Sequence, residues 1–315
     1  MGRRDSHPDP SLTKALLVSA RHMLVLAHAA RPDALVAAKE VCEQLRRAGL
    51  TPVIAPTGHP LRAEVGGVVA TLEKVSIDKI ELTIVLGGDG TILGAAELTR
   101  GSAAPLLGIN HGHVGFLAES EKDDLAWTVA TALAGDYVVE ERLVLDVSVR
   151  RGEEELFHTF AINEATIEKA SRARMIEVGL EIDGRPISTF GADGVVMATP
   201  TGSTAYSFSA GGPIVWPGVE ALLMVPLSAH ALFARPLVVG PDSAMAVEVL
   251  ERSASPAILW CDGRRGVEIA PGSRVIATKS DTPIRLARLH PGPFTDRLVR
   301  KFSLPVTGWR GPVEE

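Results

Sequence analysis

A glycine-rich turn that carries one carboxylate, residues 87–91 (GGDGT), is the strongest chemical signal in the sequence. It follows the apolar run 82–86 and precedes a helical pattern through residue 98, so it marks a junction between a buried strand and a helix. Glycines let the backbone approach phosphate, and the first amides of a helix attract anions. We therefore expect Gly87, Gly88 and Thr91 to bind the phosphates of the phosphoryl donor.

Asp89 is unexpected beside phosphates, because a carboxylate repels them. It is useful there if it binds a metal ion or accepts a proton from an attacking hydroxyl, and both roles belong to phosphoryl transfer. The alternative is that Asp89 only caps the helix while the glycines form a tight turn. The spacing alone favours neither interpretation.

A second cluster, residues 199–213 (TPTGSTAYSFSAGGP), is dense in small hydroxyl side chains and glycines. Such a segment presents amides and hydroxyls to a polar ligand, and Tyr206 can cover an adenine or nicotinamide ring. A plain surface turn needs only one or two such residues, so ligand contact is the favoured interpretation.

The pair Asn163 and Glu164 follows the expected strand 156–162 and offers groups for a ribose diol or an adenine edge. By itself, this pair is better explained as a polar strand end.

The composition restricts the partners. The chain has 315 residues, 46% of them hydrophobic, and a formal net charge of -6, as in an ordinary globular protein without general attraction for nucleic acid or an anionic membrane. Any anion site must therefore be local.

Cys42 and Cys261 stand far apart without metal-ligating neighbours, which indicates neither a disulfide framework nor a zinc site. This use of cysteine favours the reducing cytoplasm. His111 and His113 lack a third ligand nearby and are interpreted as loop residues, so no metal ligand is assigned.

The order of the expected elements predicts an α/β fold joined to a β-rich one. Residues 1–141 alternate strands and helices and form a Rossmann-like α/β domain, with expected strands at 23–27, 51–55, 82–86 and 105–109 and expected helices at 33–48 and 123–133. Residues 142–285 form a β-rich, sandwich-like domain, with expected strands at 143–150, 156–162, 175–182, 195–198, 246–250, 257–260 and 274–278.

Asp183-Gly184 and Asp262-Gly263 mark hairpin turns in that second domain. Residues 286–315 form a C-terminal tail that includes some helical character at 294–301 and returns to the first domain.

Four segments taken in order resemble the NAD kinase family over roughly residues 82–237. They are 87–91, then 107–110 (LGIN) with Gly112 and 115–117 (GFL), then 163–164, and finally 199–213. The first segment alone is also similar to diacylglycerol, sphingosine and phosphofructokinase relatives, so the long last segment discriminates. The resemblance implies phosphorylation of the adenosine-ribose 2′-hydroxyl of NAD, with NADH left open as a second acceptor. It also implies ATP or polyphosphate as donor, Mg²⁺, and a homo-oligomer that is a dimer or, more commonly, a tetramer.

The same resemblance assigns roles to individual residues. Asp89 becomes the general base or the group that positions the hydroxyl. The remaining assignments concern the acceptor nucleotide, with Asp193 at the nicotinamide end and Tyr206 near the adenine, and they fall on Gly90, Phe116, Asn163, Glu164, Asp193, Thr204, Ala205, Tyr206 and Ser209. Gly191 is a departure, because many members with strict NAD preference carry arginine there, so discrimination against NADH is not assigned.

Two other functions compete with this one. A lipid kinase can use the same glycine-rich turn, but it needs an apolar acceptor cleft or a membrane-facing surface, for which the sequence gives no signal. A catalytically silent NAD sensor is the second alternative, and the presence of Asp89 argues against it. The prediction is therefore a cytoplasmic NAD kinase whose ligands are NAD and ATP or polyphosphate.

Overall fold

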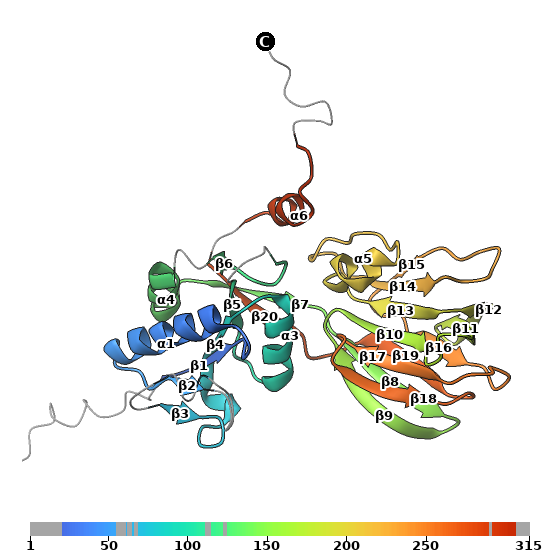
Figure 1. The fold of residues 1–315 in the computed structure, drawn as a ribbon, viewed down its shortest axis with the longest axis horizontal. Helices are drawn as coiled ribbons and strands as arrows, with labels where there is room; N and C mark the ends of the chain where they lie inside the picture. The colour runs from blue at the N-terminus through green and yellow to red at the C-terminus, as the bar shows by residue number, and fades with distance from the viewer. Residues whose placement is uncertain are drawn as a thin grey trace, which may run out of the picture.

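The computed structural model describes residues 21–54, 61, 65, 69–110, 115–121, 125–289 and 292–306, and the statements below concern these residues. His111 and His113 lie outside them. The chain forms two units, an α/β unit and a β-rich unit, with helix α3 standing at the boundary between them (Figure 1). The expected fold class is confirmed.

The first unit is built on an eight-stranded sheet in the order β3-β2-β1-β4-β5-β20-β7, with β6 paired to β5. All of its pairings are parallel except that of β20 with β7. The strands are β1 (His22–Ala27), β2 (Val53–Ile54), β3 (Ala70–Thr71), β4 (Ile80–Leu86), β5 (Leu106–Asn110), β6 (Ser120–Glu121), β7 (Val138–Arg142) and β20 (Ile284–Arg288). The helices are α1 (Pro32–Arg47), the short 3-10 helix η2 (Ile77–Lys79), α3 (Asp89–Leu98), α4 (Leu125–Ala134) and α6 (Phe294–Phe302).

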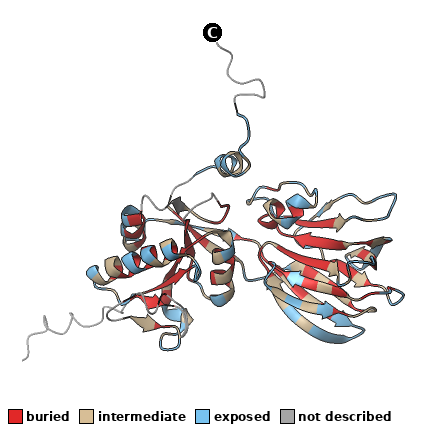
Figure 2. Ribbon diagram, in the orientation of Figure 1, coloured by how far each residue is buried: buried red, intermediate tan, exposed pale blue. Residues whose placement is uncertain are grey.

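Helices cover both faces of this sheet, which explains why its central strands are apolar throughout. In β1, Met23 and Val25 pack with α1 and α4 in one core cluster, while Leu24 and Leu26 pack with α3 in another. Figure 2 shows the buried residues concentrated in these central strands. The alternation places α1 and α4 on one face and α3 on the other.

The second unit is a sandwich of two six-stranded sheets, ordered β15-β14-β13-β10-β17-β18 and β12-β11-β16-β19-β8-β9. A single core cluster draws buried residues from both sheets, so the two sheets enclose one core. The strands are β8 (Leu145–Arg151), β9 (Glu154–Ala161), β10 (Glu164–Lys169), β11 (Ile176–Ile182), β12 (Arg185–Ala192), β13 (Gly194–Ala198), β14 (Leu222–Leu227), β15 (Leu237–Val239), β16 (Met245–Val249), β17 (Ala257–Cys261), β18 (Arg265–Ile269) and β19 (Arg274–Lys279).

Two short helical turns, η4 (Gly202–Thr204) and α5 (Tyr206–Ser209), lie between β13 and β14. Both expected hairpins are confirmed: Asp183-Gly184 joins β11 to β12, and Asp262-Gly263 joins β17 to β18. All four turn residues have positive φ, the conformation that two-residue hairpin turns require. No helix in the described part of the chain is long and apolar enough to span a membrane.

Strand β20 carries the chain back from the sandwich into the first sheet, where it pairs with β5 and β7. From there the chain continues to α6, which is described over Phe294–Phe302. Residues 290–291 and 307–315 of the expected tail lie outside the described residues.

Candidate active site

Asp89 is the first residue of α3, directly after β4. Its side-chain oxygens accept hydrogen bonds from the backbone N–H groups of Phe116 and Leu117, each at 3.0 Å. A Cβ on Gly115 would stand 2.2 Å from Oδ1 of Asp89, so the chain passes the carboxylate at a distance that only glycine allows. The carboxylate is therefore held by a different segment of the chain and not by the helix that it begins.

Two arginines from the C-terminal part of the chain fix the segment that holds Asp89. Arg297 of α6 donates from Nη1 to the carbonyls of Phe116 and Ala118, both at 3.2 Å. Arg288 of β20 donates from Nη1 to the carbonyl of Leu117 at 3.1 Å. Because charged donors make the stronger hydrogen bonds, these contacts orient the amides that face Asp89.

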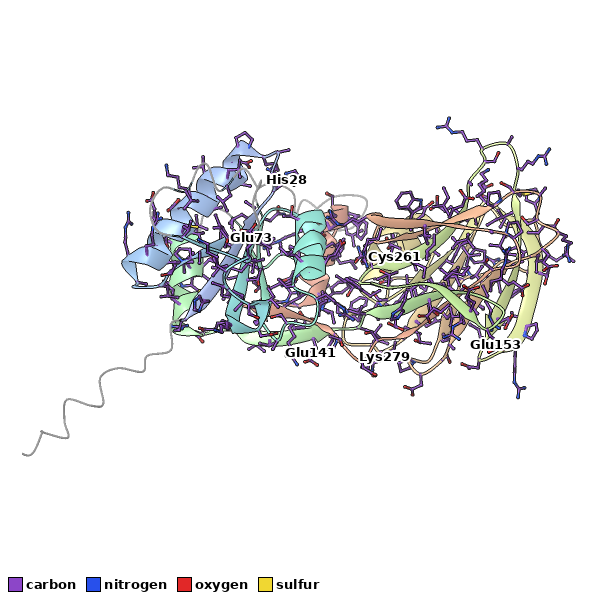
Figure 3. All side chains as sticks on the ribbon, turned by 90° about the horizontal axis from the view of Figure 1, so that it is seen from below. His28, Glu73, Glu141, Glu153, Cys261 and Lys279 are labelled. Carbon is purple, nitrogen blue, oxygen red and sulfur yellow. The ribbon has the colours of Figure 1, made fainter. Side chains whose placement is uncertain are left out.

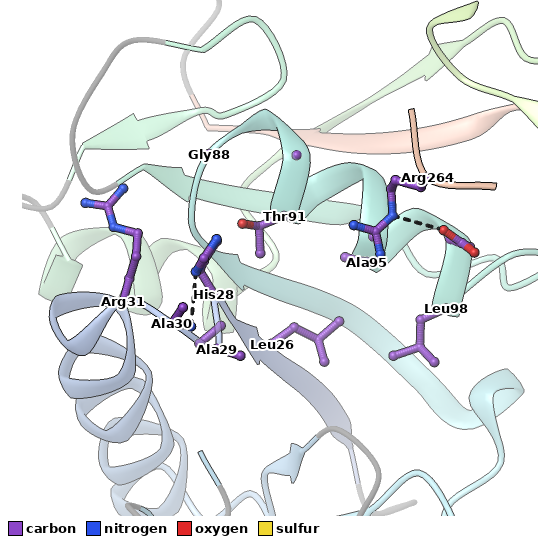
Figure 4. A pocket seen from close by; sticks show the side chains of 14 residues that line it. Leu26, His28, Ala29, Ala30, Arg31, Gly88, Thr91, Ala95, Leu98 and Arg264 are labelled. Atoms are coloured by element: carbon purple, nitrogen blue, oxygen red, sulfur yellow. Dashed lines mark hydrogen bonds and ion pairs between the residues drawn. The ribbon is translucent and has the colours of Figure 1, made fainter. Parts of the chain in front are cut away.

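A cavity of about 990 Å³ opens beside the glycine-rich turn. Gly88, Gly90 and Thr91 line it, together with the segment after β1 and Arg264 from the sandwich (Figure 4). It lies at the carboxyl ends of β1 and β4, where the strand order reverses and where open α/β sheets bind their ligands. Gly87 is not among the lining residues. A Cβ there would approach Oγ1 of Thr91 to 2.4 Å, so this glycine serves the turn itself.

The lining of this cavity suits a nucleotide with a phosphate chain. His28, Arg31 and Arg264 bring nitrogen groups to it, and Leu26, Ala95 and Leu98 supply an apolar surface. The Thr91 hydroxyl is buried and has no hydrogen-bond partner among the described residues. Because the net charge of the protein is negative, an anion can bind only where positive groups gather locally, as they do in this cavity. Figure 3 shows the labelled His28 in the first unit and Cys261 in the sandwich, with α3 between the two units.

Asn163 and Glu164 stand where β9 gives way to β10, and Glu164 is buried, with 7% of its surface exposed. Burial, and after it the nearby charge of Asp262, raise the pKa of the Glu164 carboxyl from 4.5 to about 7. The Tyr206 amide, which donates to Glu164 at 3.4 Å, opposes that shift. Glu164 therefore changes its protonation near neutral pH.

Asp262 holds the chain just before this pair. Its carboxylate accepts the amide hydrogens of Ile162, at 3.0 Å to each oxygen, and of Asn163 at 2.7 Å. Arg265 neutralises it from 2.8 Å. The hairpin turn between β17 and β18 thus positions the Asn163–Glu164 pair.

The segment 199–213 divides into a buried part and an exposed part. Thr199 and Ser203 bond backbone groups, with Oγ1 of Thr199 at 2.6 Å from the Ile162 carbonyl and Oγ of Ser203 at 2.6 Å from the Pro200 carbonyl. A Cβ on Gly202 would lie 1.9 Å from the carbonyl oxygen of Asn163. From residue 204 on, all residues of the segment except the buried Ser207 are partly or fully exposed, namely Thr204, Ala205, Tyr206, Phe208, Ser209, Ala210, Gly211, Gly212 and Pro213. The first residues of the segment therefore support the Asn163–Glu164 pair, and the later ones face outward.

Asp193 and Gly191 lie at the end of β12. The carboxylate of Asp193 pairs with Nζ of Lys169 at 2.5 Å. The carbonyl of Gly191 accepts the amide hydrogen of His230 at 2.8 Å, and a Cβ at this glycine would meet Met175 at an ordinary 3.5 Å. A Cβ at position 191 therefore fits without a shift of its neighbours.

The Phe116 ring is buried beneath α6. Its centroid lies 5.7 Å from that of Phe294 and 6.0 Å from that of Phe302. Phe302 also contacts Phe208 of α5 at 4.5 Å. Helix α6 therefore links the segment that holds Asp89 to the outward-facing part of residues 199–213.

The part of the site around Asp89 packs against the part that carries Asn163 and Glu164. Ile162, which precedes Asn163, packs in the same core cluster as Ile92, Leu93 and Leu117, close in sequence to Asp89 and to the amides that hold it. Local sequence patterns do not predict this arrangement, and they assign no role to Arg264, Arg288 or Arg297. Asp262 was recognised only as part of a turn. Each acts on residues far away in the chain, which local patterns do not reveal.

The described residues contain no group of three or more His, Cys, Asp or Glu side chains that could hold a metal ion. Cys42 and Cys261 are both free and buried, and burial raises the pKa of these thiols to about 11 and about 12, respectively. They remain protonated at neutral pH and offer no metal-binding thiolate.

Comparison with known proteins covers almost the whole chain. A model of the ATP-NAD kinase N-terminal domain matches residues 23–137, and a model of the ATP-NAD kinase C-terminal domain matches residues 162–289. A NAD kinase of Leifsonia xyli is 61% identical over 94% of this chain and 99% of its own length. A NAD kinase of Thermobifida fusca is 56% identical over 94% and 93%, respectively.

Two solved structures are similar in fold. Yeast NADH kinase complexed with NADH aligns with a TM-score of 0.81 at 20% identity, covering 94% of this chain and 90% of its own. A NAD kinase from Archaeoglobus fulgidus in complex with ATP aligns with a TM-score of 0.69 at 25% identity, covering 90% and 100%.

Proposed function

The chain belongs to the NAD kinase family, and from that premise we propose how its two units divide the phosphorylation of NAD to NADP between them. The α/β unit holds the donor in the 990 Å³ cavity beside the glycine-rich turn. The sandwich holds the acceptor. Asp89 stands at the boundary, where the phosphoryl group passes from one to the other.

The observation that carries this proposal is the fixed carboxylate of Asp89. Both of its oxygens accept backbone amides, and Gly88 and Gly90 on either side of it line the cavity. A carboxylate with this fixed direction can accept the proton of a hydroxyl that approaches from the acceptor side. Its position at a helix start leaves the neighbouring amides free to face phosphate.

The reaction is an in-line transfer. The 2′-oxygen of the adenosine ribose attacks the terminal phosphorus of ATP, and the bond from that phosphorus to the bridging oxygen breaks. The bridging oxygen leaves with the bonding electron pair as part of ADP, and the hydroxyl proton passes to Asp89. Because the chemistry needs little covalent help from the protein, alignment of the two oxygens contributes most of the rate.

Mg²⁺ fits this site as a companion of the donor. No group of three potential ligands stands ready among the described residues, and Mg²⁺ commonly binds to substrate phosphates with one or two carboxylates. When bound, Mg²⁺ would be held by the phosphates of ATP beside the glycine-rich turn and would supply positive charge that offsets the charge of the phosphate chain. Polyphosphate, which has no base to fill the apolar part of the cavity, is the weaker donor.

The acceptor contacts follow from the resemblance and suit the exposed groups of the sandwich. Asn163 and Glu164 hold the dinucleotide, with Asp193 toward the nicotinamide end and Tyr206 toward the adenine. Thr204, Ala205 and Ser209 line the same surface, and Gly90 and Phe116 face it from the first unit. Tyr206 and Phe208, each 40% exposed, offer ring surface for stacking. NADH remains a second acceptor, because Gly191 stands where many family members with strict NAD preference carry arginine.

We also assign the chain to the cytoplasm, whose reducing conditions suit two free thiols, and to a dimer or tetramer. Leu232 is fully exposed and Phe233 is 57% exposed between β14 and β15, which supports burial against a second copy. Light scattering of the purified chain tests the oligomeric state.

One assay tests the function. The purified chain is mixed with NAD, ATP and Mg²⁺ and coupled to a dehydrogenase that accepts only NADP. We expect a signal that requires all three components. A lipid kinase and a silent NAD sensor both give none, so absence of NADP formation overturns the proposal.

A further inference from the structure

Arg264 reaches from the sandwich into the cavity of the α/β unit. It follows the β17–β18 hairpin turn, in which Asp262 and Gly263 have φ values of 53° and 63°. Its amide donates to the Cys261 carbonyl at 3.1 Å, which closes the turn. Figure 4 shows its guanidinium above α3, facing the same space as Gly88 and Thr91.

The turn that carries Arg264 is anchored on both sides. Asp262 accepts the amide hydrogens of Ile162 and Asn163. On the other side, Arg265 donates from Nη1 to Oγ1 of Thr159 and to the Phe160 carbonyl, both at 2.8 Å, and stacks on the Phe160 ring at 3.9 Å. The backbone at Arg264 is therefore fixed relative to the strand end that carries Asn163 and Glu164.

The side chain of Arg264 is held lightly. Its Nε lies 3.2 Å from a Glu97 oxygen, and half of the side chain is exposed. Within the described part of the chain, no hydrogen bond engages its two terminal nitrogens. Gly94 makes room for it, because a Cβ at that position would come within 3.2 Å of Nη2. An exposed ion pair of this kind contributes little to stability and is easily exchanged for another.

We propose that Arg264 binds the phosphate chain of the donor nucleotide, with Glu97 as its partner while the cavity holds no nucleotide. This inference rests on the proposed function. The planar guanidinium presents paired N–H groups that match phosphate oxygens, and phosphate binds them more strongly than an exposed carboxylate does. The donor would then be held by residues of both units: the amides of the glycine-rich turn in one and Arg264 in the other. Donor binding would in this way draw the acceptor-binding sandwich toward the phosphates.

The competing explanation is a clamp. In that case the Arg264–Glu97 ion pair only joins the two units, and the donor never touches the arginine. The two explanations predict different effects on KM for ATP when Glu97 is replaced. Loss of Glu97 weakens a clamp at least as much as loss of Arg264 does, because Glu97 also pairs with Arg265 at 3.6 Å. The same loss leaves a phosphate-binding Arg264 in place and removes a nearby negative charge.

The test compares Arg264→Ala, Arg264→Lys and Glu97→Gln with the control Arg252→Ala. Arg252 is also an exposed arginine with one ion pair, to Glu177 at 2.6 Å, and it does not line the cavity. We measure KM for ATP and for NAD in the coupled assay, dissociation constants for MgATP by calorimetry, and Tm for each variant.

We expect Arg264→Ala to raise KM and Kd for ATP by about tenfold or more, as loss of a charged hydrogen bond does, with KM for NAD unchanged. Arg264→Lys should recover part of that loss, and Glu97→Gln and Arg252→Ala should not raise KM for ATP. An unchanged KM for ATP in Arg264→Ala overturns the inference. So do a parallel rise in both KM values, an equal rise in Glu97→Gln, or an equal rise in the control. Each of these results leaves the proposed function standing, which fails only if the unaltered chain forms no NADP.

Discussion

The two units place their principal carboxylates in opposite surroundings. Asp89 stands at the end of a parallel strand beside an open cavity, and both of its oxygens accept amide hydrogens. Glu164 is buried in the sandwich with one amide donor at 3.4 Å and the carboxylate of Asp262 nearby, and its pKa rises to about 7. The same chemical group is thus held by two amides beside an open cavity in one unit and is buried with a raised pKa in the other, and the proposed function assigns reaction to the first and recognition to the second.

The comparison extends to the glycines around each carboxylate. Gly115 passes Asp89 with no room for a Cβ, but the atom it would meet is the end of a side chain that can swing away. Gly202 passes the Asn163 backbone at a similar distance, and that backbone cannot move alone. A larger residue at Gly115 should therefore lower turnover with little loss of stability, whereas a larger residue at Gly202 should lower both turnover and stability.

The largest effect is expected for Asp89→Asn. Asparagine keeps the shape but accepts no proton, and its NH₂ group cannot replace the second oxygen toward the backbone amides. Turnover should fall by about two orders of magnitude or more, with NAD affinity largely kept. Steady-state kinetics and NAD titration measure the two quantities. Turnover within a few-fold of the unaltered enzyme would remove Asp89 from the chemistry.

Gly115→Ala tests whether position alone matters for Asp89. The new methyl group would stand 2.2 Å from Oδ1, so the carboxylate must turn away while the rest of the fold remains. We expect turnover to fall by about tenfold or more, since small misplacements are costly in catalysis, with little change in Tm. Gly240→Ala is the control, because nothing lies within 4 Å of its Cβ. A large drop in Tm with normal turnover would contradict this view of Asp89.

Glu164→Gln tests the buried side of the comparison through pH. The folded pKa of about 7 lies above the ordinary 4.5, so the folded protein binds the proton more tightly than the unfolded chain does. The stabilisation from this group is complete below about pH 4.5 and is lost as the pH rises through 7. At pH 8 the variant should therefore be more stable than the unaltered protein by about 2 kcal/mol, with little difference near pH 4.5.

Urea unfolding at pH 5, 6.5 and 8 measures this difference. The raised pKa of Asp262, which burial causes, remains in the variant and leaves some pH dependence in both curves. Equal slopes for the two proteins would show that Glu164 is ionised in the folded state at all three values.

The smallest effect is expected for Gly191→Arg. Many family members with strict NAD preference carry arginine at this position, so an arginine here should shift the ratio of specificity constants several-fold toward NAD. The matched control is Gly191→Ala, whose methyl group meets Met175 only at an ordinary distance and should leave the ratio unchanged. A ratio that stays constant in the arginine variant would end the proposed role of this position.

The sequence determined the features that depend on neighbouring residues. The glycine-rich turn with its acid lies at a strand–helix junction because residues 82–86 are apolar apart from Thr83 and residues 89–98 follow helical spacing. Both Asp-Gly pairs form hairpin turns because such residues tolerate positive φ. The alternation of strands and helices, followed by strands alone, was sufficient for the fold class.

The strands β7 and β20 escaped prediction for a physical reason. The sequence of each strand mixes charged residues with apolar ones, as in a solvent-exposed segment. The two strands are stable because they pair with each other in the sheet. Arg285 pairs with Glu141 at 2.9 Å and Arg288 with Glu140 at 2.5 Å across them. These partners are more than 140 positions apart, and no local pattern records their meeting.

Tertiary structure alone decided how the site is assembled. The motifs named Asp89, Asn163 and Glu164, but the amides that aim Asp89 take their positions from Arg288 and Arg297, and the Asn163–Glu164 pair takes its position from Asp262. Local sequence specifies which groups are present and the element on which each lies. Their directions depend on hydrogen bonds between residues that lie from 27 to 181 positions apart, and these bonds exist only after the chain has folded.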